Sequence, residues 1–318
     1  MKNGVISLGE ALIDFIPMDA SNSLYQKCPG GAPANVAVGL ARLNVESLFL
    51  GKVGNDVLGR FLIETLGNYG VDTTAVSTTD EVRTGAVFVT LAANGERSFD
   101  FYINPSADQF LQEEEIKESY FKNKKILHIG SISLINEPVR SATHKAVALA
   151  KQYGMLISYD PNLRLGLWSD AKIAKSMILS MLPEVDVLKV SEEELEFLTG
   201  AADIKAGVNV LQSTWKIPFI IVTCGANGSI LVTEREYVAV PALKVNAIDT
   251  TGAGDAYVSG ILYRLNQLSD CGAVDFSYEQ LLEVGKFASV AGGLAAATKG
   301  AMTGLPTLEQ IIECLKEE

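Results

Sequence analysis

The sequence has little of what several classes of protein require. It holds only two histidines, His128 and His144, which excludes a metal site built from several histidines. Its four cysteines are widely spaced and form no CxxC pair, so we expect free, mostly buried thiols in a reducing compartment. No hydrophobic run approaches membrane-spanning length, and the apolar start, broken by Glu10 and Asp14, is too short for a signal peptide. These absences favour a cytoplasmic protein.

Positive charge is also scarce. The 26 Lys and Arg residues against 38 Asp and Glu residues give a net charge of −12, which argues against a nucleic-acid or anionic-membrane surface. Any phosphate group must therefore be held by local N–H donors and a few basic side chains. The length of 318 residues suits one large α/β domain with a small appendage.

Short hydrophobic strands alternate with helical patterns along most of the chain. Such alternation predicts right-handed βαβ units and a mainly parallel sheet. We expect strands at 5–8, 47–53, 126–129, 156–160, 185–190, 219–223, 229–233 and 237–240. We expect helices at 33–43, 56–69, 137–153, 170–182, 192–198, 278–298 and 308–315, and another after Gly252.

A different pattern interrupts this alternation. The segments 84–91 and 97–102 are rich in β-branched and aromatic residues around Ala93-Asn94-Gly95-Glu96, which predicts a hairpin. The segments 12–17 and 24–28 are suited to pair with it. We therefore divide the chain into an α/β unit (1–11, 29–82 and 105–318) and a small β unit (12–28 and 83–104).

The segment from Asp249 to Ala256, DTTGAGDA, is the most informative stretch. Its small residues allow a sharp turn, and an amphipathic helix follows at once. The first turn of a helix binds anions, because it has unpaired N–H donors and the positive end of the helix dipole. Asp255 would stand inside this anion site, where a carboxylate serves better as a base beside a transferred phosphate than as an anion ligand. A glycine-rich turn alone is often only structural.

Polar residues follow three of the expected strands, where ligands of open parallel sheets bind. They are Asp160 to Arg164, Ser191 to Glu194, and Cys224 to Gly228, and together with the Asp249–Asp255 loop they predict one cleft. Each has a structural alternative. Glu194 could belong to a solvated helix start and Arg164 to a surface ion pair. Gly225 and Gly228 could form only a turn, and GGAPAN (30–35) could be only a helix entrance.

Two of these motifs resemble a known family. GGAPAN near the start and DTTGAGD near the end resemble both signature regions of the ribokinase-like (PfkB) sugar kinases, in the same order and over nearly the whole chain. Four further stretches resemble fructokinases within that family: RSFDFYINPSAD (97–108), HIGSISLINEP (128–138), SYDPNLRLGLW (158–168) and KVSEEELEFLTG (189–200).

This resemblance implies a ribokinase-like three-layer α/β/α fold with a mainly parallel central sheet and a small β-sheet lid over the sugar. It implies ATP-dependent phosphorylation of the primary hydroxyl of D-fructose, giving fructose 6-phosphate and ADP, and a homodimer through the lid. The alternatives are a 2-keto-3-deoxygluconate kinase, a ribokinase-type kinase with a ribose or nucleoside acceptor, and a sugar-binding regulator without catalysis.

The resemblance also implies residue roles. Asp255 would be the base. The backbone from Gly252 to Asp255, with the N–H groups of Ala253, Gly254 and Asp255, would form the anion hole for the transferred phosphoryl group, assisted by Arg164. Sugar contacts would be Asp14, Gly30, Gly31, Asn35, Arg97 and Asn162. ATP contacts would be Lys189, Ser191, Thr223, Gly225 and Gly228, with the 278–298 helix beside the adenine. Glu194 would position Mg²⁺ largely through water. A monovalent cation such as K⁺ would lie by Asp249, Thr251, Ala295, Thr298 and Gly300.

The sequence departs from the family pattern at two positions. Ser191 stands where many relatives carry Asn, which we expect to weaken ion binding more than activity. Ile103 stands where many fructokinases carry Arg after the Phe-Tyr pair, which removes a lid contact to sugar or phosphate and bears on the choice of fructose.

Overall fold

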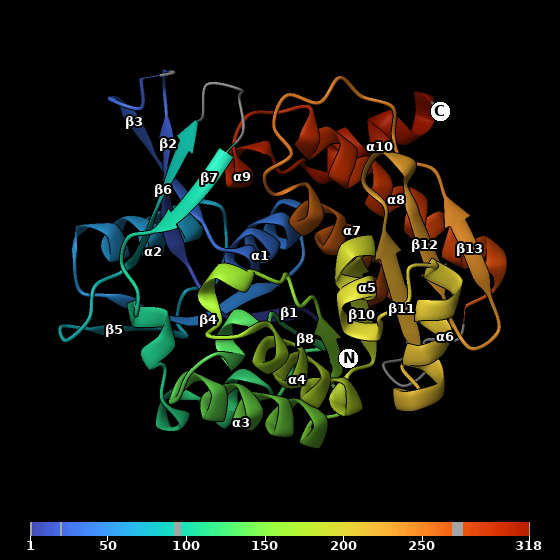
Figure 1. The fold of residues 1–318 in the computed structure, drawn as a ribbon, viewed down its shortest axis with the longest axis horizontal. Coiled ribbons are helices and arrows are strands. Elements are labelled where there is room, and N and C mark those ends of the chain that lie inside the picture. The colour runs from blue at the N-terminus through green and yellow to red at the C-terminus, as the bar shows by residue number, and fades with distance from the viewer. Residues whose placement is uncertain (1, 20, 92–96, 269–275, 318) are drawn as a thin grey trace.

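A large twisted sheet forms the centre of the molecule (Figure 1). The structure, a computed structural model, describes residues 2–19, 21–91, 97–268 and 276–317. The strands of the large sheet are β1 (Val5–Leu8), β4 (Ser47–Gly54), β5 (Val76–Thr79), β8 (Ile126–Ile129), β9 (Leu156–Tyr159), β10 (Val187–Ser191), β11 (Phe219–Thr223), β12 (Ser229–Val232) and β13 (Tyr237–Val240). Their order is β13-β12-β11-β10-β9-β8-β1-β4-β5.

The strands from β11 through β5 run parallel, whereas β12 and β13 are antiparallel additions at one edge. The central strands are hydrophobic and buried along their whole length, as parallel strands covered on both faces require. Successive residues serve opposite faces, so Val5 packs in one hydrophobic cluster and Ile6 in the other.

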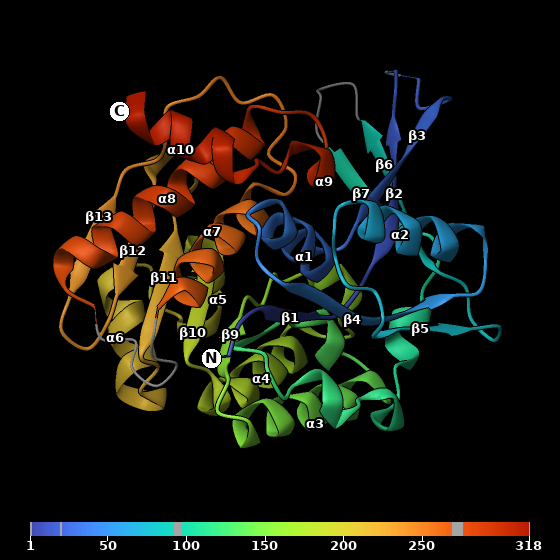
Figure 2. The ribbon, with the colours of Figure 1, turned by 180° about the vertical axis from the view of Figure 1, so that it is seen from behind.

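Helices cover both faces of this sheet, which gives the three layers (Figures 1 and 2). One face carries α3 (Val139–Gln152), α4 (Ala171–Met181), α5 (Glu192–Thr199) and α6 (Ile204–Trp215). The other carries α1 (Ala32–Arg42), α7 (Ala253–Gln267) and α8 (Tyr278–Ala296). The remaining helices are α2 (Val57–Asn68), α9 (Ala301–Gly304) and α10 (Leu308–Glu317). In the described parts of the chain, none of the helices has both the length and the apolar character to cross a membrane.

A second, four-stranded sheet stands beside the large one, in the order β3-β2-β6-β7 (Figure 1). Its strands are β2 (Leu12–Pro17), β3 (Tyr25–Gly30), β6 (Gly85–Leu91) and β7 (Arg97–Phe101). Antiparallel pairing of β6 with β7 confirms the predicted hairpin strands, although residues 92–96 of the turn lie outside the described residues. β2 pairs with β6 of the hairpin, as expected, whereas β3 pairs with β2 and not with the hairpin; the rings of Phe15 and Phe88 stack at 4.8 Å.

The structure confirms the α/β/α fold with its small β sheet and nearly all of the expected elements. Asp56 caps α2 by accepting hydrogen bonds from the N–H groups of Leu58 and Gly59. The sequence interpretation missed α6, the short helix α9 and the edge strand β5. The division into two units at 12–28 and 83–104 stays a prediction. Cys28 and Cys224 are free thiols but only half-buried, and Cys271 lies outside the described residues.

Candidate active site

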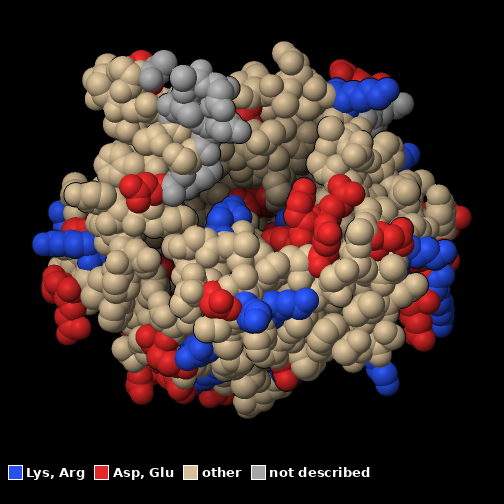
Figure 3. Space-filling view, in the orientation of Figure 1, with Lys and Arg blue, Asp and Glu red and all other residues tan. Residues whose placement is uncertain are grey.

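The polar residues predicted to share one cleft do lie along one edge of the large sheet. They follow β9, β10 and β11 at their carboxyl ends, and Glu10 and Ser131 follow β1 and β8 at the same edge. The molecular surface is hollowed on this side, between the small sheet and the α7–α8 side, and acidic side chains gather over the start of α5 (Figure 3). The start of α7 lies at the centre of this region.

The turn into α7 has the geometry that the sequence predicts. Gly252 precedes the helix with φ +81°, a conformation that favours glycine, and a Cβ there would stand 3.1 Å from the Cα of Ala301. The N–H of Ala253 donates to the carbonyl of Thr250 at 3.2 Å. Gly254 and Asp255 occupy the first turn, where N–H groups have no intrahelical acceptor. The turn therefore presents N–H donors beside the Asp255 carboxylate.

Asp255 is held by a residue from the other end of the sequence. The side-chain Nδ2 of Asn35, on α1, donates to Oδ2 of Asp255 at 2.7 Å. Burial raises the pKa of Asp255 to about 6, and the charge of Asp160 adds to this rise. The Asn35 hydrogen bond and the charges of Lys189 and Arg164 act in the opposite direction. At neutral pH the carboxylate is ionised yet basic enough to accept a proton.

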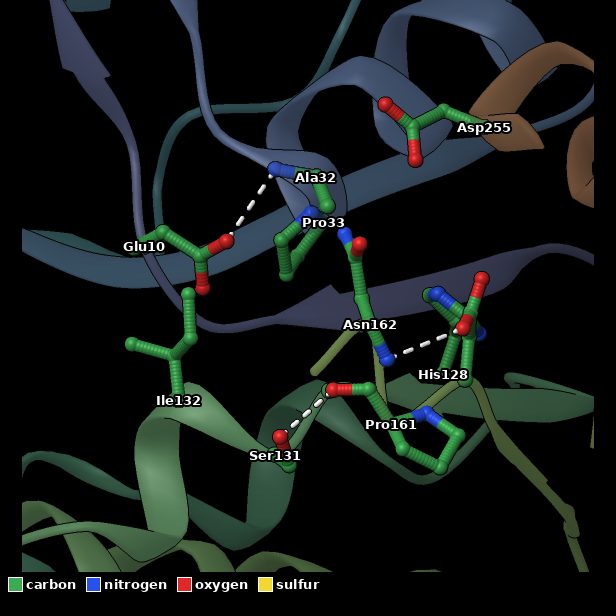
Figure 4. Close-up of a pocket in the computed structure, with 11 residues that line it drawn as sticks. Glu10, Ala32, Pro33, His128, Ser131, Ile132, Pro161, Asn162 and Asp255 are labelled. Atoms are coloured by element: carbon green, nitrogen blue, oxygen red, sulfur yellow. Dashed lines mark hydrogen bonds between the residues drawn. The ribbon is translucent and has the colours of Figure 1, made fainter. Parts of the chain in front are cut away.

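A small cavity of about 10 Å³ lies against Asp255 (Figure 4). Its volume matches a single water-sized probe, so it is a recess in the floor of the site rather than room for a sugar. Its polar lining consists of Glu10, His128, Ser131, Asp160, Asn162 and Asp255. The hydroxyl of Ser131 donates to the carbonyl of Pro161 at 2.5 Å, which ties the loops after β8 and β9 together.

The sequence interpretation did not include Glu10 among the site residues and treated it only as a charge that interrupts an apolar segment. Its Oε1 accepts the N–H of Ala32 at 3.1 Å, at the start of α1. Burial raises the pKa of Glu10 to about 8, and the charges of Asp108 and Asp255 add to this rise. An acid directly after a buried strand, at the carboxyl edge of the sheet, was the available signal. His128, interpreted as structural, is buried with its Nδ1 3.0 Å from the hydroxyl of Ser158; it also lines the cavity, and burial lowers its pKa to about 3.

The two glycines of GGAPAN make room for the side chain of Asp14 and the backbone of Glu10. A Cβ on Gly30 would stand 2.3 Å from Oδ2 of Asp14, and a Cβ on Gly31 would stand 2.5 Å from the carbonyl oxygen of Glu10. Gly31 also has φ +103°. Burial raises the pKa of Asp14 to about 6, while the charge of Arg164 acts against this rise. Asp14 and Asp255 therefore both lie within the electrostatic reach of one exposed guanidinium.

Lys189 joins the start of α7 to the loop after β9. Its Nζ lies 2.9 Å from Oδ2 of Asp160, and a Cβ on Gly254 would stand 3.7 Å from it. Burial alone would lower the pKa of Lys189, but the carboxylates of Asp160 and Glu194 outweigh burial and raise it. A buried, charged ammonium at this point adds positive charge beside the first turn of α7.

Ser191 and Glu194 form the capping box of α5. The hydroxyl of Ser191 accepts the N–H of Glu194 at 3.1 Å, and Oε2 of Glu194 accepts the N–H of Ser191 at 2.8 Å. Oε1 of Glu194 accepts the N–H of Leu163 at 2.7 Å. Glu194 therefore caps α5 but is not the solvated residue of the structural alternative, since burial raises its pKa, and each of its carboxylate oxygens keeps a second lone pair. Asn162 has φ +45°, and its N–H donates to Oδ1 of Asp160.

A larger pocket of about 520 Å³ opens on the other side of the α7 turn. Its volume suits a small-molecule ligand. Of the predicted ATP contacts, the turn after β11 supplies Thr223, Gly225 and Gly228, and α8 supplies Ser289, Gly292 and Gly293 to the facing wall. Ala253 and Gly254 line this pocket, whereas Asp255 lines the small cavity. Asp255 therefore stands at the junction of the two.

Comparison with known proteins bears directly on this arrangement. The pfkB family carbohydrate kinase profile matches residues 2–308. The chain is 42% identical to Fructokinase-1 of Zea mays over 98% of each sequence. The chain belongs to the pfkB family of carbohydrate kinases.

Two solved structures of fructokinases resemble this pfkB-family chain throughout. One is a double mutant from Vibrio cholerae O395 in a fructose-, ADP- and potassium-bound form, at 42% identity and a TM-score of 0.89, covering 98% of this chain and 99% of that one. The other, from Xylella fastidiosa with bound ATP, has 33% identity and a TM-score of 0.94, covering 100% and 99%. These likenesses confirm the ribokinase-like fold and the resemblance to fructokinases.

The residues predicted to bind a monovalent cation form a second cluster, made by the turn before α7, the end of α8 and the loop that follows α8. The carboxylate of Asp249 accepts the N–H groups of Thr251 and Gly300 at 3.0 and 3.1 Å, which joins the α7 turn to the loop after α8. The carbonyl oxygens of Ala295 and Thr298 lie 3.3 and 3.4 Å from the Cβ that Gly304 lacks. The side chain of Arg97 lies outside the described residues.

Proposed function

We propose that this protein is an ATP-dependent fructokinase, which transfers the γ-phosphoryl group of ATP to the primary hydroxyl of D-fructose. The products are fructose 6-phosphate and ADP. The observation that carries the proposal is the position of Asp255, at the junction between a nucleotide-sized pocket and a small cavity whose lining includes Glu10 and Asp160. The relatives whose names include fructokinase, fructose, ADP and ATP support the choice of substrates.

Asp255 acts as the general base. Its carboxylate takes the proton from the sugar hydroxyl while the hydroxyl oxygen attacks the γ-phosphorus, and the bond from the γ-phosphorus to the bridging oxygen of ADP breaks. The pKa of about 6 keeps Asp255 ionised at neutral pH and still able to hold that proton. ADP leaves with the electron pair of the broken bond.

Charge on the transferred group is stabilised at the start of α7. The N–H donors and positive dipole end of its first turn, with the ammonium of Lys189 beside Gly254, face the position where negative charge develops. Arg164, exposed on the loop after β9, is free of carboxylate hydrogen bonds within the described residues and serves as a mobile phosphate clamp.

The nucleotide occupies the larger pocket, with its base between the turn after β11 and α8. Gly293 lets α8 lie close to Leu243, since a Cβ on Gly293 would stand 2.8 Å from Cβ of Leu243, and Gly292 lets α8 lie close to α7, 3.2 Å from the carbonyl oxygen of Ala253 by the same measure. Within the described residues, no group of three or more His, Cys, Asp or Glu side chains could cage a metal. Mg²⁺ would therefore be held mainly by phosphates and water, with Glu194 at one side, and would neutralise phosphate charge.

The sugar binds between GGAPAN and the small sheet, which acts as a lid. Asp14 projects from β2 of that sheet against Gly30, and Asn35 and Asn162 lie near Asp255, the general base. The oxygen acceptors and amide donors of these side chains suit sugar hydroxyls. Closure of the lid would exclude water and so protect ATP from hydrolysis.

The lid is also the proposed interface of a homodimer. It exposes large apolar side chains at Met18, Leu24 and Tyr102, with exposed fractions of 55%, 65% and 72%. Apolar groups so exposed favour association with another surface. Light scattering of the purified protein tests this: a mass of twice 34.0 kDa supports it, and a monomer at all concentrations contradicts it.

A monovalent cation site is proposed at the loop cluster of Asp249, Thr251, Ala295, Thr298 and Gly300. The supporting observation is that the Asp249 carboxylate bridges N–H groups of both loops, so that a negative charge and several carbonyl oxygens gather behind the α7 turn. A bound K⁺ would stiffen the turn that carries Asp255. The cytoplasm is the proposed location, where half-buried thiols such as Cys28 and Cys224 stay reduced.

The role of Asp255 is tested by the Asp255→Asn substitution. We expect kcat to fall by roughly 10²- to 10⁴-fold, the usual contribution of a general base, while ATP binding persists. A coupled assay of ADP release measures this. The matched control is Asp186→Asn, which alters a half-buried carboxylate bonded to the N–H of Ile157, far from the site, and should leave kcat unchanged. A near-normal rate in folded Asp255→Asn would exclude the base assignment.

A panel of acceptors tests the sugar. D-Fructose should give the highest kcat/KM, ahead of ribose, a nucleoside and 2-keto-3-deoxygluconate. Preference for the sugar acid or for ribose would keep the kinase and change the acceptor. Fructose binding by calorimetry without any ADP release in the presence of Mg²⁺ would support the non-catalytic regulator instead.

A further inference from the structure

The contact between Asn35 and Asp255 joins the two signature regions of the chain. The residues are 220 positions apart, and Nδ2 of Asn35 lies 2.7 Å from Oδ2 of Asp255. Asn35 is only 5% exposed, and within the described residues its Oδ1 has no hydrogen-bond partner. Because a carboxylate can only accept a hydrogen bond, the Asn35 nitrogen is the group that donates.

Asn35 is held firmly in this position. Its backbone N–H donates to the carbonyl of Gly31 at 2.8 Å, and the N–H of Ala32 donates to Glu10, so the first turn of α1 is anchored at its start. The hydroxyl of Ser259 on α7 lies 3.3 Å from the carbonyl of Val36 and 2.8 Å from the carbonyl of Asp255. The two helices therefore fix the Asn35 amide and the Asp255 carboxylate relative to each other.

We propose that Asn35 is a positioning residue for the base: its amide N–H occupies Oδ2 of Asp255 and directs Oδ1 to the sugar hydroxyl. This inference rests on the proposed function, in which Asp255 is the base. It assigns to Asn35 an effect on the orientation and charge of Asp255 that is separate from any contact with the sugar. The unpartnered Oδ1 of Asn35 stays available to a ligand hydroxyl.

The charged groups around Asp255 also affect its ionisation, so they must be considered before the proposal is tested by varying the pH. Asp160 opposes ionisation of Asp255, whereas Lys189 and Arg164 favour it. Glu10 and His128 line the same cavity; with pKa values of about 8 and about 3, both are uncharged at pH 7. A neutral amide contributes no charge, so Asn35 acts only through its hydrogen bond, which stabilises the ionised form of Asp255.

The first experiment is Asn35→Ala. Loss of the donor should raise the pKa of Asp255 above about 6, so the acidic limb of the kcat profile should move to higher pH by roughly one pH unit. The kcat at pH 7 should fall and recover partly at pH 8.5. A rise in KM for fructose with an unmoved acidic limb would overturn the proposal, because it would show sugar contact alone.

The second variant is Asn35→Asp, which places two carboxylates at 2.7 Å. Because such a pair shares one proton, the acidic limb should move further than in Asn35→Ala. Val38→Ala, a buried change on the same helix, is the matched control and should leave the limb in place. An Asn35→Asp profile identical to that of Val38→Ala would contradict the proposal.

A direct titration separates this inference from the proposed function. The carboxyl of Asp255 can be followed by carbon-13 NMR of aspartate-labelled protein without substrate, with Asp255→Asn identifying its signal. A higher pKa in Asn35→Ala than in the unaltered protein supports the positioning contact even if no sugar is phosphorylated. An unchanged pKa overturns it even in an active kinase.

Discussion

At the scale of single residues, the site is a set of acids whose charge depends on burial. Burial raises the pKa of Glu10 to about 8, and it raises the pKa values of Asp108 and Asp255 to about 6. If all three were ionised, the charges of Asp108 and Asp255 would repel that of Glu10 and add to the cost of burying it. A protonated Glu10 still accepts the Ala32 N–H and so anchors α1 without adding a negative charge.

Glu10→Gln tests this account through stability. A group whose pKa is 4.5 unfolded and about 8 folded contributes stability that is complete below pH 4.5 and is lost as the pH rises through 8. The glutamine variant keeps an acceptor for Ala32 but does not titrate. Relative to it, the unaltered protein should lose about 4 kcal/mol of unfolding free energy between pH 5 and pH 9. Urea denaturation at both pH values measures this; a constant difference would mean that Glu10 is ionised when folded.

At the scale of elements, the entrances of helices decide where the reactive groups lie. Both α1 and α7 begin at a glycine with positive φ, Gly31 and Gly252. At Gly31 the constraint is double, since the backbone is left-handed and the carbonyl oxygen of Glu10 occupies the space of a Cβ. Gly70 has a similar φ of +86° but nothing within 4 Å of its missing Cβ.

Comparing Gly31→Ala with Gly70→Ala therefore separates two contributions to the loss of stability, the backbone strain at positive φ and the close contact with a neighbouring atom. Gly70→Ala should lower the unfolding free energy by about 1 kcal/mol through φ alone. Gly31→Ala should lower it by about 3 kcal/mol, because the Glu10 carbonyl must also move, and it should raise KM for the sugar. Thermal denaturation and steady-state kinetics measure the two effects. Equal losses at both positions would mean that the contact with Glu10 contributes nothing.

Element prediction failed where packing overrides local preference. The helix α6 contains a glycine in its middle, Gly207, and several β-branched residues, which weaken a helical signal. In the fold, a Cβ at Gly207 would stand 2.8 Å from Leu195 of α5, so the glycine permits close packing of the two helices. The edge strand β5 is short and half-polar, and its pairing with β4 defines it.

At the scale of the whole molecule, binding couples to folding because both ligand regions exist only in the folded chain. Asp255→Asn allows this to be measured without turnover, since ATP and fructose should bind but not react. Each ligand at 100 times its Kd should add about 2.7 kcal/mol of unfolding free energy, seen as a rise in Tm by calorimetry. If ATP stabilises the variant and fructose does not, fructose is excluded as the acceptor, and the proposal that the larger pocket binds ATP is still supported.

The sequence by itself determined the alternating βαβ pattern, the hairpin strands of the small sheet, and the turn that places Asp255 on the first turn of a helix. These follow from periodicity and glycine chemistry, which act over a few residues. Only the tertiary structure decided that Asn35 donates to Asp255, that Lys189 lies beside Gly254, and that Glu10 is buried and protonated. Those facts depend on burial and on contacts between distant segments, and neither has a signature in local sequence.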